Sequence, residues 1–340
     1  MISPQEVRNL ALDFAIHLGL KTKGCPPFSK RFYQDFMKRH PKIILNTQED
    51  KIISKACSKE NLNLHYISLK KILNKYELFD RPYLIYNIAV KEITPCYNSL
   101  NQDLSKLTEK PKKINSQGNA TTMICCGNAA GHHVPPFFIF SGINFQQQWL
   151  SSGTTWSGGT VSPSGILTKE TFLHYLKEHL LKFIPTPTAE QPILLICDGH
   201  TCPVSVSLIE WAMVHYIIIF ILPAHTSPVL QPLELSCFKP LETDLTKRQL
   251  NLMKCDQTKS LSNVMLCELG SKAYQEAVQA RYLPDGFKKA GIFPFRGIND
   301  PSGIPAKSSQ HPDTHSRTRN KTERVTRTKP QSIEDHCGKY

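Results

Sequence analysis

The sequence predicts an α/β protein in which a mixed β-sheet is flanked by helices and preceded by a small all-helical region. Before residue 40, apolar residues recur with the 3.6-residue period of helices. From Arg81 onward, short β-rich apolar runs appear instead, and helical patterns fall between the later runs. Strands that come first alone and then alternate with helices are typical of a mixed sheet covered by helices.

The N-terminal region predicts two helices joined by a Gly/Pro-rich turn. Ser3-Pro4-Gln5-Glu6 is a capping box, and the apolar face that follows it ends at Gly19. A second helix is expected from Ser29 to just before Pro41, with outward-facing polar side chains at Lys30, Arg31, Gln34, Lys38 and Arg39. This outline fits a helix-turn-helix whose second helix enters the DNA major groove, and it equally fits an ordinary solvated basic helix.

The remaining elements follow from the changing period. Residues 46–80 show looser helical signals and predict a helical linker, with Leu69, Ile72, Leu73 and Tyr76 on one face. Strands are expected at residues 83–88, 121–126, 137–140, 193–197 and 217–222, and helices from Thr168 to about Phe183 and from Ser205 to Tyr216. The lysine-rich segment Lys106 to Lys113 predicts a surface loop.

Charge and cysteine usage restrict the class of protein. Lys and Arg number 41 against 28 Asp and Glu, a net charge of +13 that favours a polyanionic partner such as DNA but also fits a merely basic protein. The basic, Ser/Thr-rich residues 297–340 predict a disordered tail. The longest apolar run, Ile217 to Leu222, is too short for a membrane span, so no membrane association is expected. The eleven cysteines contain no CxxC pair, which predicts buried thiols in a reducing compartment.

Two acidic side chains follow apolar strands. Asp198 ends the run Ile193-Leu-Leu-Ile-Cys197, and Glu234 begins a helix shortly after the run that ends at Leu222. Side chains at the carboxyl ends of adjacent strands converge, and carboxylate oxygens are the ligands that Mg²⁺ prefers. Taken alone, Asp198-Gly199 also fits a simple turn.

The sequence motifs around these acids resemble those of the DDE-type transposase and endonuclease family of pogo, Tigger and jerky-like elements, which includes centromere-protein-B-like domesticated proteins. The matching stretches occur in the family's order over residues 81 to about 296: Ile85-Tyr-Asn-Ile88, Asn119-Ala-Thr-Thr122, Val134-Pro-Pro-Phe-Phe-Ile-Phe140, Leu194-Leu-Ile-Cys-Asp-Gly-His200, Leu222-Pro-Ala-His-Thr-Ser227, Leu230-Gln-Pro-Leu-Glu234 and Gly286-Phe-Lys-Lys-Ala-Gly-Ile-Phe-Pro294. The helix at residues 29–39 is similar to the recognition helix in the second half of the family's two-part DNA-binding region.

The resemblance implies a domain organisation and a site. It implies a partial centromere-protein-B-type helix-turn-helix at residues 1–45, the linker at 46–80, an RNase H-like DDE domain at 81–296 and the tail at 297–340. It implies that Mg²⁺ or Mn²⁺ would be held by three acids if the protein is catalytically competent, and that no cofactor is held otherwise. Asp198 matches the second acid, and Glu234 matches the third, where such family members usually have Asp.

The first acid departs from the family pattern. The family's first strand continues as Asn-x-Asp-Glu, whereas Asn87-Ile88 is followed here by Ala89-Val90. A methyl group cannot coordinate a metal, and the substitute Glu92 is expected on the opposite strand face from Ala89. The family's Asp-Gly-His-x-x-His pattern also ends in Pro203 rather than histidine. His132, His133, His200 and His225 are interpreted as loop or cleft residues, because a hard-metal site uses oxygen ligands.

Three hypotheses about function follow. The first is a nuclear, transposase-derived DNA-binding protein, a pseudo-enzyme whose cleavage activity is lost. The second is an active Mg²⁺-dependent endonuclease or strand transferase that uses Asp198, Glu234 and an unassigned third ligand such as Glu92. The third is a protein-interaction scaffold without DNA. A homo-oligomer stays open, since transposases of this kind act as multimers but no heptad pattern supports an assembly surface.

Overall fold

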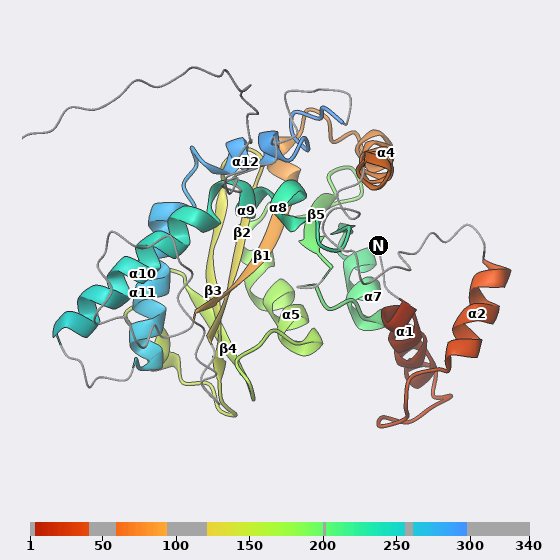
Figure 1. Ribbon diagram of the computed structural model, residues 1–340, viewed down its shortest axis with the longest axis horizontal. Coiled ribbons are helices and arrows are strands. Elements are labelled where there is room, and N and C mark those ends of the chain that lie inside the picture. The colour runs from red at the N-terminus through yellow and green to blue at the C-terminus, as the bar shows by residue number, and fades with distance from the viewer. Residues whose placement is uncertain (1–3, 41–58, 94–120, 200–201, 256–260, 298–340) are drawn as a thin grey trace, which may run out of the picture. The chain divides into compact units, whose positions relative to one another are not determined.

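The computed structural model describes residues 4–40, 59–93, 121–199, 202–255 and 261–297 (Figure 1). Among the described residues, three helices precede the first strand: α1 (Pro4–His17), α2 (Lys30–Arg39) and α4 (Lys59–Lys75). Ser29 caps α2, because its hydroxyl accepts a hydrogen bond from the backbone N–H of Phe32 at 3.1 Å. Both helices expected before residue 40 are therefore present, close to the expected bounds.

A six-stranded sheet forms the centre of the fold. Its strands are β1 (Ile85–Ile93), β2 (Thr121–Asn128), β3 (His133–Ser141), β4 (Gly158–Ser162), β5 (Ile193–Asp198) and β6 (Ile217–Leu222). The strand order is β4-β3-β2-β1-β5-β6. β1, β2 and β3 form an antiparallel meander, and β5 and β6 continue the sheet in parallel from β1. This is the RNase H-like arrangement, and it confirms the predicted mixed α/β class.

Helices cover both faces of the sheet (Figure 1). One face packs against α4, against the continuous helix formed by α5 (Lys169–Tyr175), a π-helical turn (Leu176–Leu180) and α6 (Leu181–Phe183), and against α7 (Val206–Val214). The other face packs against α9 (Pro232–Ser236), α10 (Phe238–Cys255) and α11 (Asn263–Ala277). Two short helices, α8 (Ser227–Leu230) and α12 (Leu283–Lys289), complete this part of the chain.

The helices expected at 168–183 and 205–216 are confirmed, and so is the apolar face of α4. Leu69 and Leu73 of α4 are fully buried, while Ile72 and Tyr76 pack against the same core. Of the seven cysteines whose surroundings the structure describes, six are buried free thiols, as the sequence predicts.

Some expectations differ from the structure or lie outside the described residues. The first strand begins at Ile85 and runs to Ile93, because residues 82–84 form a 3₁₀ turn that starts with Pro82. The short edge strand β4 and the helices α10 and α11 were not expected from the sequence. The loop predicted at Lys106 to Lys113 lies outside the described residues. So does the tail predicted at 297–340, except for its first residue, Gly297.

Candidate active site

Asp198 lies at the carboxyl end of β5, a strand that is buried along its whole length. Only 8% of the residue is exposed, and its carboxylate is held by the Ser227 hydroxyl, which donates to Oδ2 at 2.5 Å. The backbone carbonyl of Asp198 accepts from the N–H of Cys202 at 2.8 Å. The apolar strand β5 thus places Asp198 at the carboxyl end of the parallel strands, where Ser227 of α8 fixes the orientation of its carboxylate.

Ala89 occupies the neighbouring position on β1. The parallel register pairs Ile88 with Cys197, so Ala89 and Asp198 are the next residues along two adjacent strands. Paired positions of a sheet project to the same face. The Ala89 side chain is fully buried in an apolar cluster with Met123, Cys125 and Leu233. The place beside Asp198 is therefore filled by a packed methyl group.

Glu92, the substitute considered from the sequence, is exposed and lies three residues beyond Ala89. β1 is regularly paired with β2 through this stretch, with Glu92 opposite Thr122, so the alternation of side chains is unbroken. Ala89 and Ile93 belong to the cluster beneath α9 and α10, whereas Val90 packs against the core on the opposite face. Glu92 shares the Val90 face, and the structure does not bring it to Asp198.

Glu234 lies in the first turn of α9, whose position depends on Asn87. The buried Asn87 amide accepts from the Leu233 backbone N–H at 3.1 Å and donates to the Ile196 carbonyl at 3.0 Å. One side chain therefore joins β1, β5 and α9. The sequence carries a signal for this role, because Asn87 is a polar amide within an otherwise apolar strand segment.

Asp198 and Glu234 interact electrostatically. Partial burial raises the pKa of Glu234 above its usual range, the negative charge of Asp198 raises it further, and the positive charge of Lys91 opposes both effects. Glu234 keeps solvent-exposed surface, so it lies at the rim of the site. Asp198 and Glu234 thus belong to one electrostatic neighbourhood, which Lys91 shares.

Lys91 was missed by the sequence reasoning. It lies two residues after Ala89 and so on the same strand face. Its ammonium group donates to the Glu242 carboxylate of α10 and lies 5.8 Å from the centre of the Phe238 ring. No local pattern links Lys91 to Glu242, because 151 residues separate them.

The described residues do not fit the metal site of a three-acid nuclease. Among them, no group of three or more His, Cys, Asp or Glu side chains converges to hold a metal ion. His225 is exposed, His132 and His133 lie at the β2–β3 turn, and His200 falls outside the described residues. Asp198 and Glu234 would be the protein ligands of any metal here, beside a buried methyl group and a lysine.

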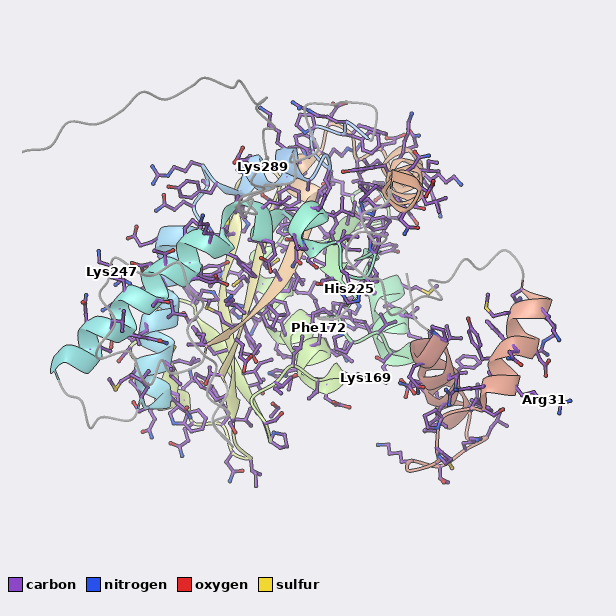
Figure 2. All side chains as sticks on the ribbon, viewed as in Figure 1. Arg31, Lys169, Phe172, His225, Lys247 and Lys289 are labelled. Carbon is purple, nitrogen blue, oxygen red and sulfur yellow. The ribbon has the colours of Figure 1, made fainter. Side chains whose placement is uncertain are left out.

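The candidate DNA-binding side chains lie together on α2. Lys30, Arg31, Gln34, Lys38 and Arg39 are all exposed, and Figure 2 shows Arg31 directed outward from the helix. The opposite side of α2 is aromatic: the Phe28 and Phe32 rings stack at 4.3 Å, and Phe36 follows one turn later. These apolar side chains are only half-buried within the described part of the chain.

Part of the chain is similar to a known protein family. Residues 117–282, which include β2 to α11, match the model of the DDE superfamily endonuclease family. These residues are therefore similar to a DDE superfamily endonuclease domain. The matched range begins after β1, so Ala89 lies outside it.

Individual relatives are distant. An MFS-type transporter clz9 from Cochliobolus lunatus is 25% identical over 225 residues, which cover 65% of this chain and 24% of the transporter. The chain thus spans about a quarter of the length of this curated relative. None of the helices in the described ranges has the length and apolarity needed to cross a bilayer.

Solved structures of the Mos1 transposase also resemble the chain. The Mos1 paired-end complex with the left transposon end has 12% identity and a TM-score of 0.37, over 85% of this chain and 75% of that one. The Mos1 catalytic domain with raltegravir and Mn has 11% identity and a TM-score of 0.35, over 70% of this chain and 96% of that one.

Proposed function

We propose that this chain is a transposase-derived DNA-binding protein whose DDE endonuclease domain no longer cleaves DNA. The observation that carries the proposal is Ala89, a buried methyl group in the strand position beside Asp198. Two-metal hydrolysis of a phosphodiester requires carboxylates that clamp both ions. This domain has the sheet and two of the three acids, but a buried alanine stands at the position of the other acid. We therefore expect the fold to be preserved and the phosphodiester cleavage to be lost.

The finer family assignment belongs to this proposal. The sequence motifs between residues 81 and 296 favour the pogo, Tigger and jerky-like branch with its centromere-protein-B-like members. In that interpretation α1 and α2 belong to the second half of the family's two-part DNA-binding region, residues 81–296 form the DDE domain, and the protein acts in the nucleus.

DNA is the proposed partner because of where the positive charge lies. The net charge of +13 is accompanied by four exposed cationic side chains on one short helix, α2, with Gln34 between them. Lysine and arginine side chains that displace counterions from phosphates supply most of non-specific DNA affinity. The endonuclease domain that follows is of a class that acts on the same polyanion.

Nicking of supercoiled plasmid in Mn²⁺ tests the loss of cleavage. We expect the purified wild type and Asp198→Ala to be equally inert, which also controls for contaminating nuclease. Nicking by the wild type that disappears in Asp198→Ala would establish an active endonuclease with a third ligand other than Ala89, and it would overturn this part of the proposal.

A salt series of DNA binding tests the other part. We expect the logarithm of the binding constant to fall linearly with the logarithm of salt concentration, with a slope of about 0.9 per phosphate contact. Replacing Arg31, Lys38 and Arg39 by alanine should reduce this slope by up to about 3.

The matched control removes the same charge from another exposed helix surface, at Lys70, Lys71 and Lys75 of α4. This triple-alanine variant should change the slope less than the α2 variant does. A wild type without a salt dependence, or equal effects of the two triple variants, would contradict the role of α2.

A further inference from the structure

The acids at the carboxyl edge of the sheet share their neighbourhood with a lysine that belongs to the same chain. Lys91 projects from the strand face that carries Ala89, toward the helices α9 and α10 that bear Glu234 and Glu242. The Asn87 bridge to Leu233 ties α9 directly over β1, so this placement follows from the packing of the elements.

The ammonium group of Lys91 is fixed rather than freely solvated. It donates to the Glu242 carboxylate, and only 24% of the lysine side chain is exposed. The centre of the Phe238 ring, itself buried at the start of α10, lies 5.8 Å from this ammonium group. Lys91 therefore places a positive charge on the strand face that α9, the helix of Glu234, covers.

We propose that the Lys91 ammonium is the resident cation of this acidic edge and keeps divalent metal ions from binding there. A divalent ion beside Asp198 and Glu234 would stand close to a positive charge that the packing of Phe238 and Glu242 holds in place. The same fixed charge would lower metal affinity even if the missing carboxylate at position 89 were restored. Lys91 is thus a second barrier to metal binding, separate from Ala89.

Mn²⁺ binding to the full chain, measured by calorimetry without DNA, tests the proposal. The measurement compares Ala89→Asp with the double variant Ala89→Asp plus Lys91→Met, which removes the charge and keeps an apolar stem. We expect the double variant to bind Mn²⁺ at least about tenfold more tightly, a difference of about 1.4 kcal/mol. Adding Asp198→Asn should abolish the gain.

Lys91→Arg is the matched control, because it keeps the positive charge next to Glu242. In the Ala89→Asp background it should leave Mn²⁺ affinity as weak as it is with lysine. Equal affinity with methionine and lysine at position 91, including no binding in either, would overturn the proposal. Mn²⁺ binding by the wild type that depends on Asp198 would overturn it as well.

A second measurement covers the case in which the buried aspartate prevents folding. With Ala89 retained, Mn²⁺ should raise the melting temperature of Lys91→Met more than that of the wild type or Lys91→Arg, because a ligand stabilises the state that binds it. Equal shifts in the three proteins would refute the role of Lys91. None of these readouts involves DNA, so their outcome is independent of whether the chain binds DNA or cleaves it.

Discussion

The carboxyl end of β5 and the adjoining part of β1 lie side by side in the sheet, yet they carry opposite kinds of side chain. β5 ends in Asp198, which Ser227 orients by a hydrogen bond. The neighbouring position on β1 is Ala89, enclosed by apolar side chains. At neighbouring positions, two strands that pair residue by residue thus carry an oriented acid and a residue of the hydrophobic core.

The difference shows that packing and chemistry make separable demands on the same sheet. The described neighbours that share a cluster with Ala89 include Met123, Cys125 and Leu233, none of which can satisfy a carboxylate well. Burying an unpaired charge in such surroundings costs several kcal/mol. The strand is therefore built for a small apolar residue at this position, while the β5 end still provides a polar partner for its acid.

The largest expected effect comes from weakening the platform that both positions share. Leu194 of β5 is fully buried and pairs with Ile85 of β1. Leu194→Ala should lower the free energy of unfolding by about 4 kcal/mol, through lost apolar burial and the cavity left behind. Urea unfolding measures this change, and Leu252→Ala on the exposed surface of α10 should change stability by no more than about 0.5 kcal/mol.

A loss of less than about 1 kcal/mol in Leu194→Ala would mean that β5 and β1 are not jointly buried as described.

The pH dependence of stability sharpens the comparison, because part of it arises on the opposite face of the sheet. Burial lowers the pKa of His65 from 6.5 to about 4, so the folded protein favours the neutral imidazole. The neutral His65 contributes fully to the free energy of unfolding above pH 6.5. This contribution, about 3 kcal/mol in total, is lost as the pH falls toward 4. His65→Leu should therefore flatten the stability profile between these pH values.

His179 provides the second test of the same range. Burial also lowers its pKa to about 4, and its Nε2 lies 2.9 Å from the Pro135 carbonyl oxygen. Part of the slope should therefore persist in His65→Leu and disappear only when His179 is replaced as well. Urea unfolding at several pH values gives the measurement, and a profile unaltered by His65→Leu would contradict the burial of this ring.

Asn87 connects the two ends that are compared. Asn87→Leu leaves the buried N–H of Leu233 and the carbonyl of Ile196 without this partner, and should cost about 2 kcal/mol. Asn87→Asp, which keeps an acceptor for the Leu233 N–H but loses the amide donor to Ile196, serves as the comparison variant. Equal stability of wild type and Asn87→Leu, measured by thermal unfolding, would show that the bridge is not formed.

The sequence predicts one half of this site better than the other. Asp198 follows an uninterrupted apolar run, and Glu234 follows Pro232, so both could be placed at element ends from local pattern alone. The period of a strand also predicts that Glu92 faces away from Ala89. These features depend on neighbours in the chain.

The remaining contacts depend on tertiary packing. The Asn87 bridge, the Lys91–Glu242 pair and the enclosure of Ala89 join segments far apart in sequence, and each requires knowing which helix covers which face of the sheet. The strand β4 was missed for a related reason. Its residues Gly158 and Gly159 have little intrinsic strand preference, and parallel pairing with β3 defines the strand.

The smallest expected effect concerns the hydroxyl that orients Asp198. Ser227→Ala removes the hydrogen bond to the carboxylate and should lower the free energy of unfolding by about 1 kcal/mol, since Asp198 keeps other interactions and water can reach the edge. Asp198→Asn weakens the same bond by removing the charge. In a double-mutant cycle, Ser227→Ala should therefore cost clearly less in the Asp198→Asn background than in the wild type. Equal costs in the two backgrounds would mean that Ser227 stabilises α8 by itself, and that the retained acid on β5 is no more specifically supported than the alanine beside it.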